Sequence, residues 1–179
     1  MVKRARNASS DILAAAREVT ARQGAGNLTI DSIAREIGMS KGGVLYNFPS
    51  KRALLSALLE NLIEAHDVRM DEIDQDEPNA TLRGHLHSRA SANDLEADLS
   101  MAILAAAAES PELLNPLRQK IESNQQKVTS QTKDPVGAHV ILAALDGLRF
   151  QHLMRMPPYD TKIRDQIQDR LESMIDELQ

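Results

Sequence analysis

The chain has 179 residues, no cysteine and a net charge of −5. The absence of cysteine excludes disulfides, a catalytic thiol and cysteine-ligated zinc. Apolar residues make up 42% of the chain but aromatic residues only 2%, so the core is expected to be aliphatic, and such residues favour helices. Since no long stretch alternates apolar and polar residues with a period of two, the sequence predicts an all-α fold.

The charge is unevenly distributed along the chain. Residues 1–60 contain nine Lys/Arg and five Asp/Glu, whereas residues 61–179 contain twelve and twenty-one. A basic head on an acidic body is typical of a protein whose one end meets phosphate, although chance unevenness would give the same pattern. The basic start, MVKRARNASS, lacks the apolar centre of a signal peptide. No segment is apolar over a membrane-spanning length, so we expect a cytoplasmic protein with no membrane association.

Capping residues, glycines and prolines mark the expected helix boundaries in chain order. The predicted helices cover about residues 10–23, 30–37, 41–47, 51–70, 80–92, 95–109, 111–131, 135–154 and 161–178. The first three form a head, residues 1–52, and about six longer helices form a body, residues 53–179. No flexible linker separates the two, so head and body are expected to share the helix that starts near Lys51.

Residues 29–55, TIDSIAREIGMSKGGVLYNFPSKRALL, have the pattern of a helix-turn-helix. Thr29 and Ser40 are suited to cap two short helices, and Gly38 is suited to a left-handed helix end between them. A helix-turn-helix places its second helix in the DNA major groove. This segment therefore predicts binding of double-stranded DNA.

Several residues of this segment are candidates for DNA contact. Helix starts favour phosphate, lysines add positive charge, and glycines allow close backbone approach, although a frayed helix start would also explain Gly42 and Gly43. Tyr and Asn side chains can bond bases or phosphates. Core packing is the alternative for Tyr46 and the favoured interpretation for Phe48. The predicted DNA-binding residues are Thr29, Ser40, Lys41, Gly42, Gly43, Tyr46, Asn47 and Lys51.

Residues 29–55 resemble the DNA-binding head of TetR-family transcriptional regulators. The residues that match the family pattern are Thr29, Ala34, Gly38, Ser40, Phe48 and Lys51. Two positions depart from it, because Leu45 occupies the usual tyrosine position and Asn47 the usual histidine position. One residue along a helix turns the side chain by about 100°, so the contacts of Leu45, Tyr46 and Asn47 stay open.

The resemblance implies that the body senses a small molecule and dimerises. A sensor pocket needs apolar walls and a few polar groups. The predicted ligand-binding residues are His66, Met101, Leu104, Arg149, Phe150 and His152. Arg149 is the candidate contact for an anionic ligand, and a solvent-facing ion pair is the alternative role for this arginine.

Apolar residues of the last two helices recur at spacings typical of a helical interface. Two such helices from each chain can form a four-helix interface, and packing within one subunit is the alternative. The predicted dimerisation residues are Val140, Ile141, Ala144, Leu148, Ile163, Ile167, Leu171 and Met174. A two-fold dimer places its recognition helices about 34–36 Å apart and predicts a palindromic operator.

No pattern in the chain indicates catalysis or a metal. His85 and His87 are two residues apart, so on one helix they point to different sides. A nucleophile elbow and a phosphate-binding loop are both missing from the sequence. We therefore expect no metal, no cofactor and no enzymatic activity.

Together these features predict a ligand-responsive transcriptional regulator. Repression is favoured because most members of the resembled family repress. An activator, a regulator without an inducer, and a helical module that binds protein instead of DNA are the alternatives. The proposed mechanism is that ligand binding in the body shifts the helix shared with the head and changes the separation of the two heads.

Overall fold

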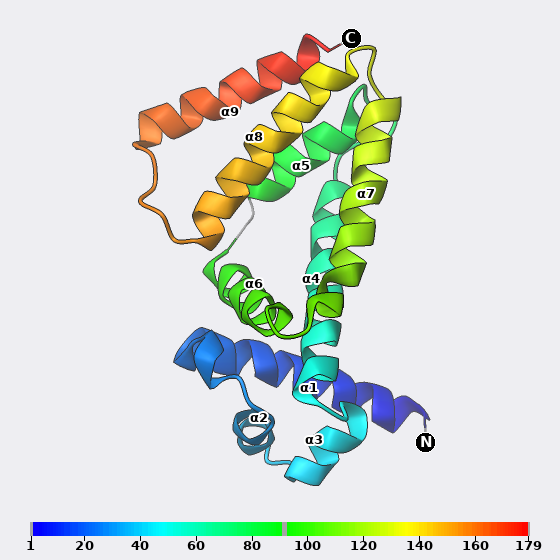
Figure 1. Ribbon diagram of the computed structural model, residues 1–179, viewed down its shortest axis with the longest axis vertical. Helices are drawn as coiled ribbons and strands as arrows, with labels where there is room; N and C mark the ends of the chain where they lie inside the picture. The colour runs from blue at the N-terminus through cyan, green and yellow to red at the C-terminus, as the bar shows by residue number, and fades with distance from the viewer. Residues whose placement is uncertain (1, 91–92, 179) are drawn as a thin grey trace. The chain divides into compact units, whose positions relative to one another are not determined.

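The computed structural model describes residues 2–90 and 93–178, and every regular element in these residues is helical (Figure 1). The α-helices are α1 Val2–Gln23, α2 Ile30–Glu36, α3 Lys41–Asn47, α4 Lys51–Met70, α5 Ala80–Ala90, α6 Asp94–Ala107, α7 Asn115–Ser130, α8 Pro135–Leu153 and α9 Thr161–Asp176, with short 3₁₀ helices at Ala25–Asn27 and Pro111–Leu114. The predicted all-α fold is confirmed. Within these described residues, no helix is both long and apolar enough to span a lipid bilayer.

The chain divides into two compact units. The first unit comprises Met1–Leu62 and Asn93–Pro116, and the second comprises Ile63–Ala92 and Leu117–Gln179. The first unit therefore contains more of the chain than the predicted head of residues 1–52. It includes the first part of α4 and the whole of α6, because α6 packs against α1.

Three helices of the first unit, α1, α2 and α3, pack on one another. The inner face of α1 is apolar, and Ile12, Ala16 and Val19 on this face are completely buried. The predicted start of this helix near Ser10 is wrong. The helix begins at Val2, because the one lysine, two arginines and two alanines that precede Ser10 are all good helix formers.

The ends of α2 and α3 are formed by local hydrogen bonds. The Thr29 hydroxyl accepts a hydrogen bond from the Ser32 amide in a capping box, and the Ser40 hydroxyl accepts one from the Gly43 amide at 3.1 Å. Gly38, at the turn, has a φ of 63°, a left-handed conformation that glycine adopts without strain. The predicted caps and the predicted turn are confirmed.

The core of the second unit is formed where α5, α8 and α9 pack together, and Figure 1 shows these three helices side by side. Its buried residues are Leu82, Leu86, Val128, Ala138, Ile141, Leu142, Leu145, Leu171, Ile175 and Leu178. Pro135 occupies the first turn of α8, and the Asp134 side chain caps it. A proline is tolerated there because the first amides of a helix have no partner within it.

The segment before α7 differs from the prediction of one helix over residues 111–131. It begins as the 3₁₀ helix Pro111–Leu114, and α7 starts only at Asn115. Pro116 explains the break, because proline has no amide hydrogen and is accommodated in the first turn of an α-helix rather than in its interior.

Candidate DNA-binding surface and effector site

Helix α3 has one buried face and one exposed face. Val44 is fully buried and Phe48, which follows the helix, is 9% exposed, whereas Tyr46 is 85% exposed. Lys41 and Gly42 are exposed as well. Phe48 therefore packs in the core, as favoured from the sequence, and Tyr46 lies on the exposed face of α3, where its contact with DNA stays a prediction.

The two glycines of α3 lie in different surroundings. A Cβ atom at Gly42 would meet only the Ser40 Oγ atom, at 3.9 Å, whereas a Cβ at Gly43 would lie 2.7 Å from the Met39 Cγ atom. A side chain at Gly43 would therefore have to displace the Met39 side chain. Gly42 has no such internal requirement, and its small size leaves the outer face of α3 open to a close partner.

The Asn47 side chain is engaged within the protein. Its Oδ1 atom accepts a hydrogen bond from the Ser9 hydroxyl at 3.2 Å, and its Nδ2 atom donates to the Gly43 carbonyl at 2.9 Å. The bond with Ser9 fastens the end of α3 to α1, and the bond with Gly43 lies within α3. The structure thus gives Asn47 a contact that positions α3, and its predicted contact with DNA stays a prediction. No local sequence signal indicates Ser9 as its partner.

The cations around this surface differ in their partners. Lys41 Nζ lies 2.9 Å from an Asp31 carboxylate oxygen, and Arg52 lies 2.6 Å from Glu112. Lys51 is exposed. Because ion pairs between exposed groups are weak, at about 0–1 kcal/mol, Lys41 can exchange Asp31 for a phosphate at little cost. Thr29 and Ser40 are exposed at the starts of their helices, where a phosphate is also favoured.

A polar cluster lies inside the second unit, where α4, α5, α7 and α8 each contribute residues. His66 Nδ1 lies 2.7 Å from the Ser88 hydroxyl and 3.3 Å from an Arg149 guanidinium nitrogen. The His66 and His85 rings are 5.4 Å apart, and His85 Nε2 lies 3.3 Å from the Asn124 amide. Arginine can only donate hydrogen bonds, so His66 Nδ1 is the acceptor and the ring is neutral.

Burial keeps both histidines uncharged. Desolvation, reinforced by the positive charge of Arg149, lowers the pKa of His66 to about 3. The same two causes lower the pKa of His85 to about 4. The Asn124 Oδ1 atom is buried without a hydrogen-bond partner in the described part of the chain. The cluster therefore combines neutral hydrogen-bonding groups with the cationic Arg149, a composition suited to binding a polar small molecule.

The structure brings only some of the predicted ligand-binding residues together. His66 and Arg149 are in direct contact, and the buried His152 Nε2 atom has no hydrogen-bond partner among the described residues. Phe150 is exposed on the surface of α8. Met101 and Leu104 belong to α6 of the first unit, and both are exposed.

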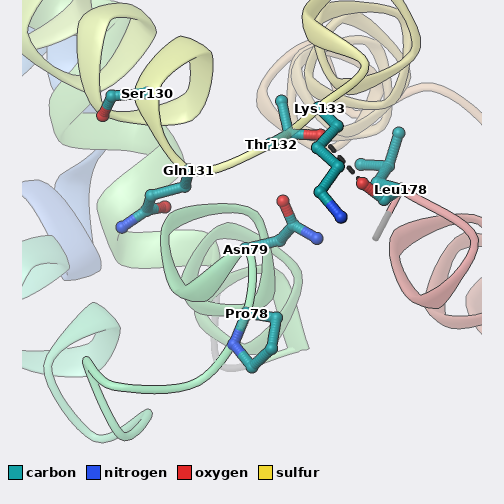
Figure 2. Close-up of a pocket in the computed structure, with 7 residues that line it drawn as sticks. All are labelled: Pro78, Asn79, Ser130, Gln131, Thr132, Lys133 and Leu178. Carbon is teal, nitrogen blue, oxygen red and sulfur yellow. Dashed lines mark hydrogen bonds between the residues drawn. The ribbon is translucent and has the colours of Figure 1, made fainter.

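A shallow pocket of about 360 Å³ lies elsewhere in the second unit (Figure 2). Its lining residues are Pro78, Asn79, Ser130, Gln131, Thr132, Lys133 and Leu178. Figure 2 shows the Thr132 hydroxyl bonded to the Leu178 carbonyl across its rim. This pocket contains none of the predicted ligand-binding residues, so it does not coincide with the polar cluster.

The predicted dimerisation residues fall into three groups. Val140, Ala144 and Ile163 are exposed, whereas Leu148, Ile167 and Met174 are partly buried against the core. Ile141 and Leu171 are core residues themselves, so the prediction is wrong for these two. A residue that is buried within its own subunit has no surface left for a second subunit.

Helix α8 has a second apolar face that the chain leaves exposed. Val136 is 75% exposed, Val140 57% and Phe150 53%, and Ala143 and Gly147 are also exposed. These residues follow one another at steps of four and three, so they form one continuous stripe. A Cβ atom at Gly147 would meet nothing within 4 Å, so packing within the chain does not explain this helix-interior glycine.

Within residues 2–90 and 93–178, no three His, Cys, Asp or Glu side chains are grouped so that they could hold a metal ion. His87 Nε2 instead lies 2.7 Å from a Glu72 carboxylate oxygen, while His85 faces the polar cluster. The two histidines thus have separate surroundings, as their spacing predicts.

Comparison with known proteins supports the predicted family. The family described as "Bacterial regulatory proteins, tetR family" matches residues 12–58, and the one described as "Tetracyclin repressor-like, C-terminal domain" matches residues 79–176. No curated protein matches the chain.

Solved structures share the fold. A transcriptional regulator from Rhodococcus sp. Rha1 is 19% identical with a TM-score of 0.71, covering 95% of each chain. A TetR transcription regulator from Haloarcula marismortui is 22% identical with a TM-score of 0.69, over 96% of this chain and 98% of that one. The multidrug binding protein EbrR, complexed with ethidium, is 23% identical with a TM-score of 0.66, over 92% and 98%. Because the two family matches cover both the helix-turn-helix and most of the remaining chain, the protein belongs to the TetR family of bacterial regulatory proteins.

Proposed function

We propose that the protein is a transcriptional repressor that binds a palindromic operator as a homodimer and is released from it by a small molecule. The observation that carries this proposal is the outer face of α3, where Tyr46 is exposed beside Lys41 and Gly42. An exposed helix face of this composition at the second position of a helix-turn-helix is suited to the major groove. Such a protein acts in the cytoplasm as a regulator and not as an enzyme.

The homodimer is proposed on the exposed apolar stripe of α8. Exposed apolar stripes of this kind mark interaction surfaces. A glycine inside a helix costs about 1 kcal/mol relative to alanine, and Gly147 has no neighbour in its own chain. Close approach of the same helix from a second copy explains both features. The two-fold symmetry of such a dimer requires the operator to be palindromic.

The effector site is proposed at the polar cluster around His66 and Arg149. Support comes from its buried, incompletely paired polar atoms and from the structural similarity to EbrR, which is known in complexes with ethidium and with imidazole. Because α4 contributes His66 and also extends into the first unit, a ligand that moves this helix can alter the head. A hundredfold loss of operator affinity requires a coupling free energy of about 2.7 kcal/mol.

Selection of bound sequences from a random pool of DNA duplexes tests this function. We expect a palindrome whose half-sites lie about one helical turn apart. The Tyr46→Ala variant should lose the enrichment, whereas Tyr159→Ala, which changes an exposed tyrosine of the second unit, should keep it. A folded wild-type protein that enriches no sequence would refute the proposal.

Release by an effector needs a second experiment. Small molecules that raise the melting temperature of the protein should be tested for dissociation of the selected duplex. Arg149→Ala should weaken the response to the ligand without weakening operator binding in its absence. A ligand that stabilises the protein but leaves operator affinity unchanged would argue against release by that compound.

A further inference from the structure

His66 lies at the centre of the polar cluster, where hydrogen-bond donors outnumber acceptors. The Ser88 hydroxyl lies 2.7 Å from His66 Nδ1, and an Arg149 guanidinium nitrogen lies 3.3 Å from the same atom. A neutral imidazole accepts through one nitrogen only, so this atom cannot accept a full hydrogen bond from both groups. Arg69 adds a further donor, because its Nε atom lies 3.3 Å from the Ser88 hydroxyl. The cluster is therefore complementary to a ligand that supplies acceptors.

The charges around the two buried histidines, His66 and His85, favour an anion. Burial lowers the pKa of both rings most, and the positive charges of Arg149 and Lys120 lower both further. Asp67 acts in the opposite direction on His85, but its carboxylate lies 2.7 Å from the Lys120 ammonium group. The electrostatic potential at the two rings is therefore positive, and a negative ligand group would be attracted there.

A second acidic side chain, Asp146, lies one helical turn before Arg149 on α8. Burial raises the pKa of the Asp146 carboxyl, and Arg149 lowers it. Since the effect of burial is the larger of the two, the surroundings of Asp146 favour its uncharged form. Its charge therefore offsets that of Arg149 less than a solvated carboxylate would.

The cluster has one group that solvent reaches and one buried acceptor. Arg149 is exposed on α8, whereas the His66 side chain that it contacts is buried, so a solute can approach the guanidinium group from outside. Asn124 is 6% exposed. Its Oδ1 atom has no hydrogen-bond partner among the residues that the structure describes, while its Nδ2 atom lies 3.3 Å from His85 Nε2. A buried acceptor of this kind is complementary to a ligand donor.

We propose that the effector bound at this cluster is a small hydroxycarboxylate, whose carboxylate group binds Arg149 and whose hydroxyl group donates to Asn124 Oδ1. This inference rests on the effector site proposed above and adds the chemical class of its ligand. An ionised carboxylate only accepts hydrogen bonds, and arginine can bind both of its oxygens through parallel N–H donors. An amine would be repelled by the same cations.

Matched small molecules test this class through the melting temperature of the protein, measured at constant ionic strength. The probes are glycolate, lactate, mandelate and salicylate, each compared with its primary amide. At least one hydroxy acid should raise the melting temperature, and its uncharged amide should bind about ten- to hundredfold more weakly. The acids without the hydroxyl group, namely acetate, propionate, phenylacetate and benzoate, should also bind more weakly than their hydroxylated counterparts.

Three variants assign the two ligand groups to their residues. Arg149→Gln should bind the hydroxy acid and its amide equally weakly, whereas Arg149→Lys should keep part of the preference, because lysine retains the charge but not the paired donors. Asn124→Leu should lose the preference for the hydroxylated acid and keep the preference for acid over amide. The control is Arg170→Gln, which removes an exposed arginine of α9 that pairs with Glu177 and should bind as the wild type does.

The outcomes separate this inference from the proposed function. If no hydroxy acid raises the melting temperature, if the amides bind as tightly as the acids, or if Arg149→Gln binds the acids as the wild type does, the assignment to a hydroxycarboxylate is wrong. A protein that selects a palindrome and is released from it by an uncharged or cationic compound would overturn this inference alone. A folded protein that binds hydroxy acids through Arg149 but selects no DNA would instead refute the proposed function.

Discussion

The two units of the protein expose surfaces of opposite character. The first unit exposes small, polar and cationic residues on a seven-residue helix, α3, whose start is capped by Ser40. The second unit exposes an apolar stripe along the nineteen-residue α8 and contains all five histidines of the chain. A cationic surface is complementary to phosphate, whereas an apolar stripe is complementary to another apolar surface. Under the proposed function, this difference assigns DNA binding to the first unit and association to the second.

The largest expected effect tests whether Ile175 of α9 belongs to the core of the second unit. Ile175 is completely buried there, whereas Ile163 on the same helix is 46% exposed. The Ile175→Ala variant should lose about 2–5 kcal/mol of unfolding free energy, because it leaves a cavity in the core. Urea unfolding followed by circular dichroism measures this loss. Ile163→Ala is the matched control, and an equal loss in both variants would contradict the assignment of only Ile175 to the core.

Acid should destabilise the second unit through its buried histidines. Folding lowers the pKa of His66 to about 3 and that of His85 to about 4, so below pH ~6.5 the unfolded chain binds protons that the folded chain does not. The contribution of the two neutral histidines to the free energy of unfolding is complete above pH ~6.5 and decreases as the pH falls toward 4. Between pH 8 and pH 5.5 the two histidines should lower the unfolding free energy by about 3 kcal/mol.

Urea unfolding at these two pH values measures the acid effect. The His66→Asn variant keeps an acceptor near the Nδ1 position but cannot titrate, so it should remove about half of the pH-dependent loss. The only two phenylalanines, Phe48 and Phe150, lie in different units. Fluorine labels on them would therefore report each unit, and an acid transition seen first at Phe48 would contradict the expectation.

A charge introduced into the exposed α8 stripe should weaken dimerisation without unfolding the protein. Val140→Glu places a carboxylate on the exposed stripe, where a second copy would have to desolvate it. We expect the dissociation constant of the dimer to rise about a hundredfold, which corresponds to about 2.7 kcal/mol of association free energy. The helix content should stay unchanged. Sedimentation equilibrium measures the association constant. Gln125→Glu, at an exposed position of α7, serves as the control, and an unchanged dimer in Val140→Glu would exclude this stripe as the interface.

The smallest expected effect concerns the cap of the recognition helix. Ser40→Ala removes the hydroxyl that accepts from the Gly43 amide and should destabilise α3 by about 1 kcal/mol. Hydrogen exchange of the α3 amides measures this change. Ser40→Asp should restore the cap but weaken DNA binding, because its carboxylate would repel phosphate. If both variants bind DNA as the wild type does, Ser40 does not lie near the phosphates.

Local signals made the head predictable from the sequence. Thr29 and Ser40 each cap a helix through an amide three residues later, and Gly38 ends α2 through its own backbone conformation. Such interactions depend on neighbouring residues only, so they are visible in a short stretch of sequence. The start of α1 was the exception. Ser9 and Ser10 are good capping residues, but both lie inside the longer helix that begins at Val2.

The sequence by itself determined the helices, their caps and the family pattern, because these depend on residues a few positions apart. Only the tertiary structure decided which apolar faces are covered. The α9 residues Leu171 and Ile175 are buried in the core, while the equally apolar Val140 of α8 stays exposed. It also decided the partners of polar groups, since Ser9 meets Asn47 across 38 residues and His66 meets Ser88 across 22. Periodicity shows that a face is apolar, but which element covers it depends on how all the helices pack together.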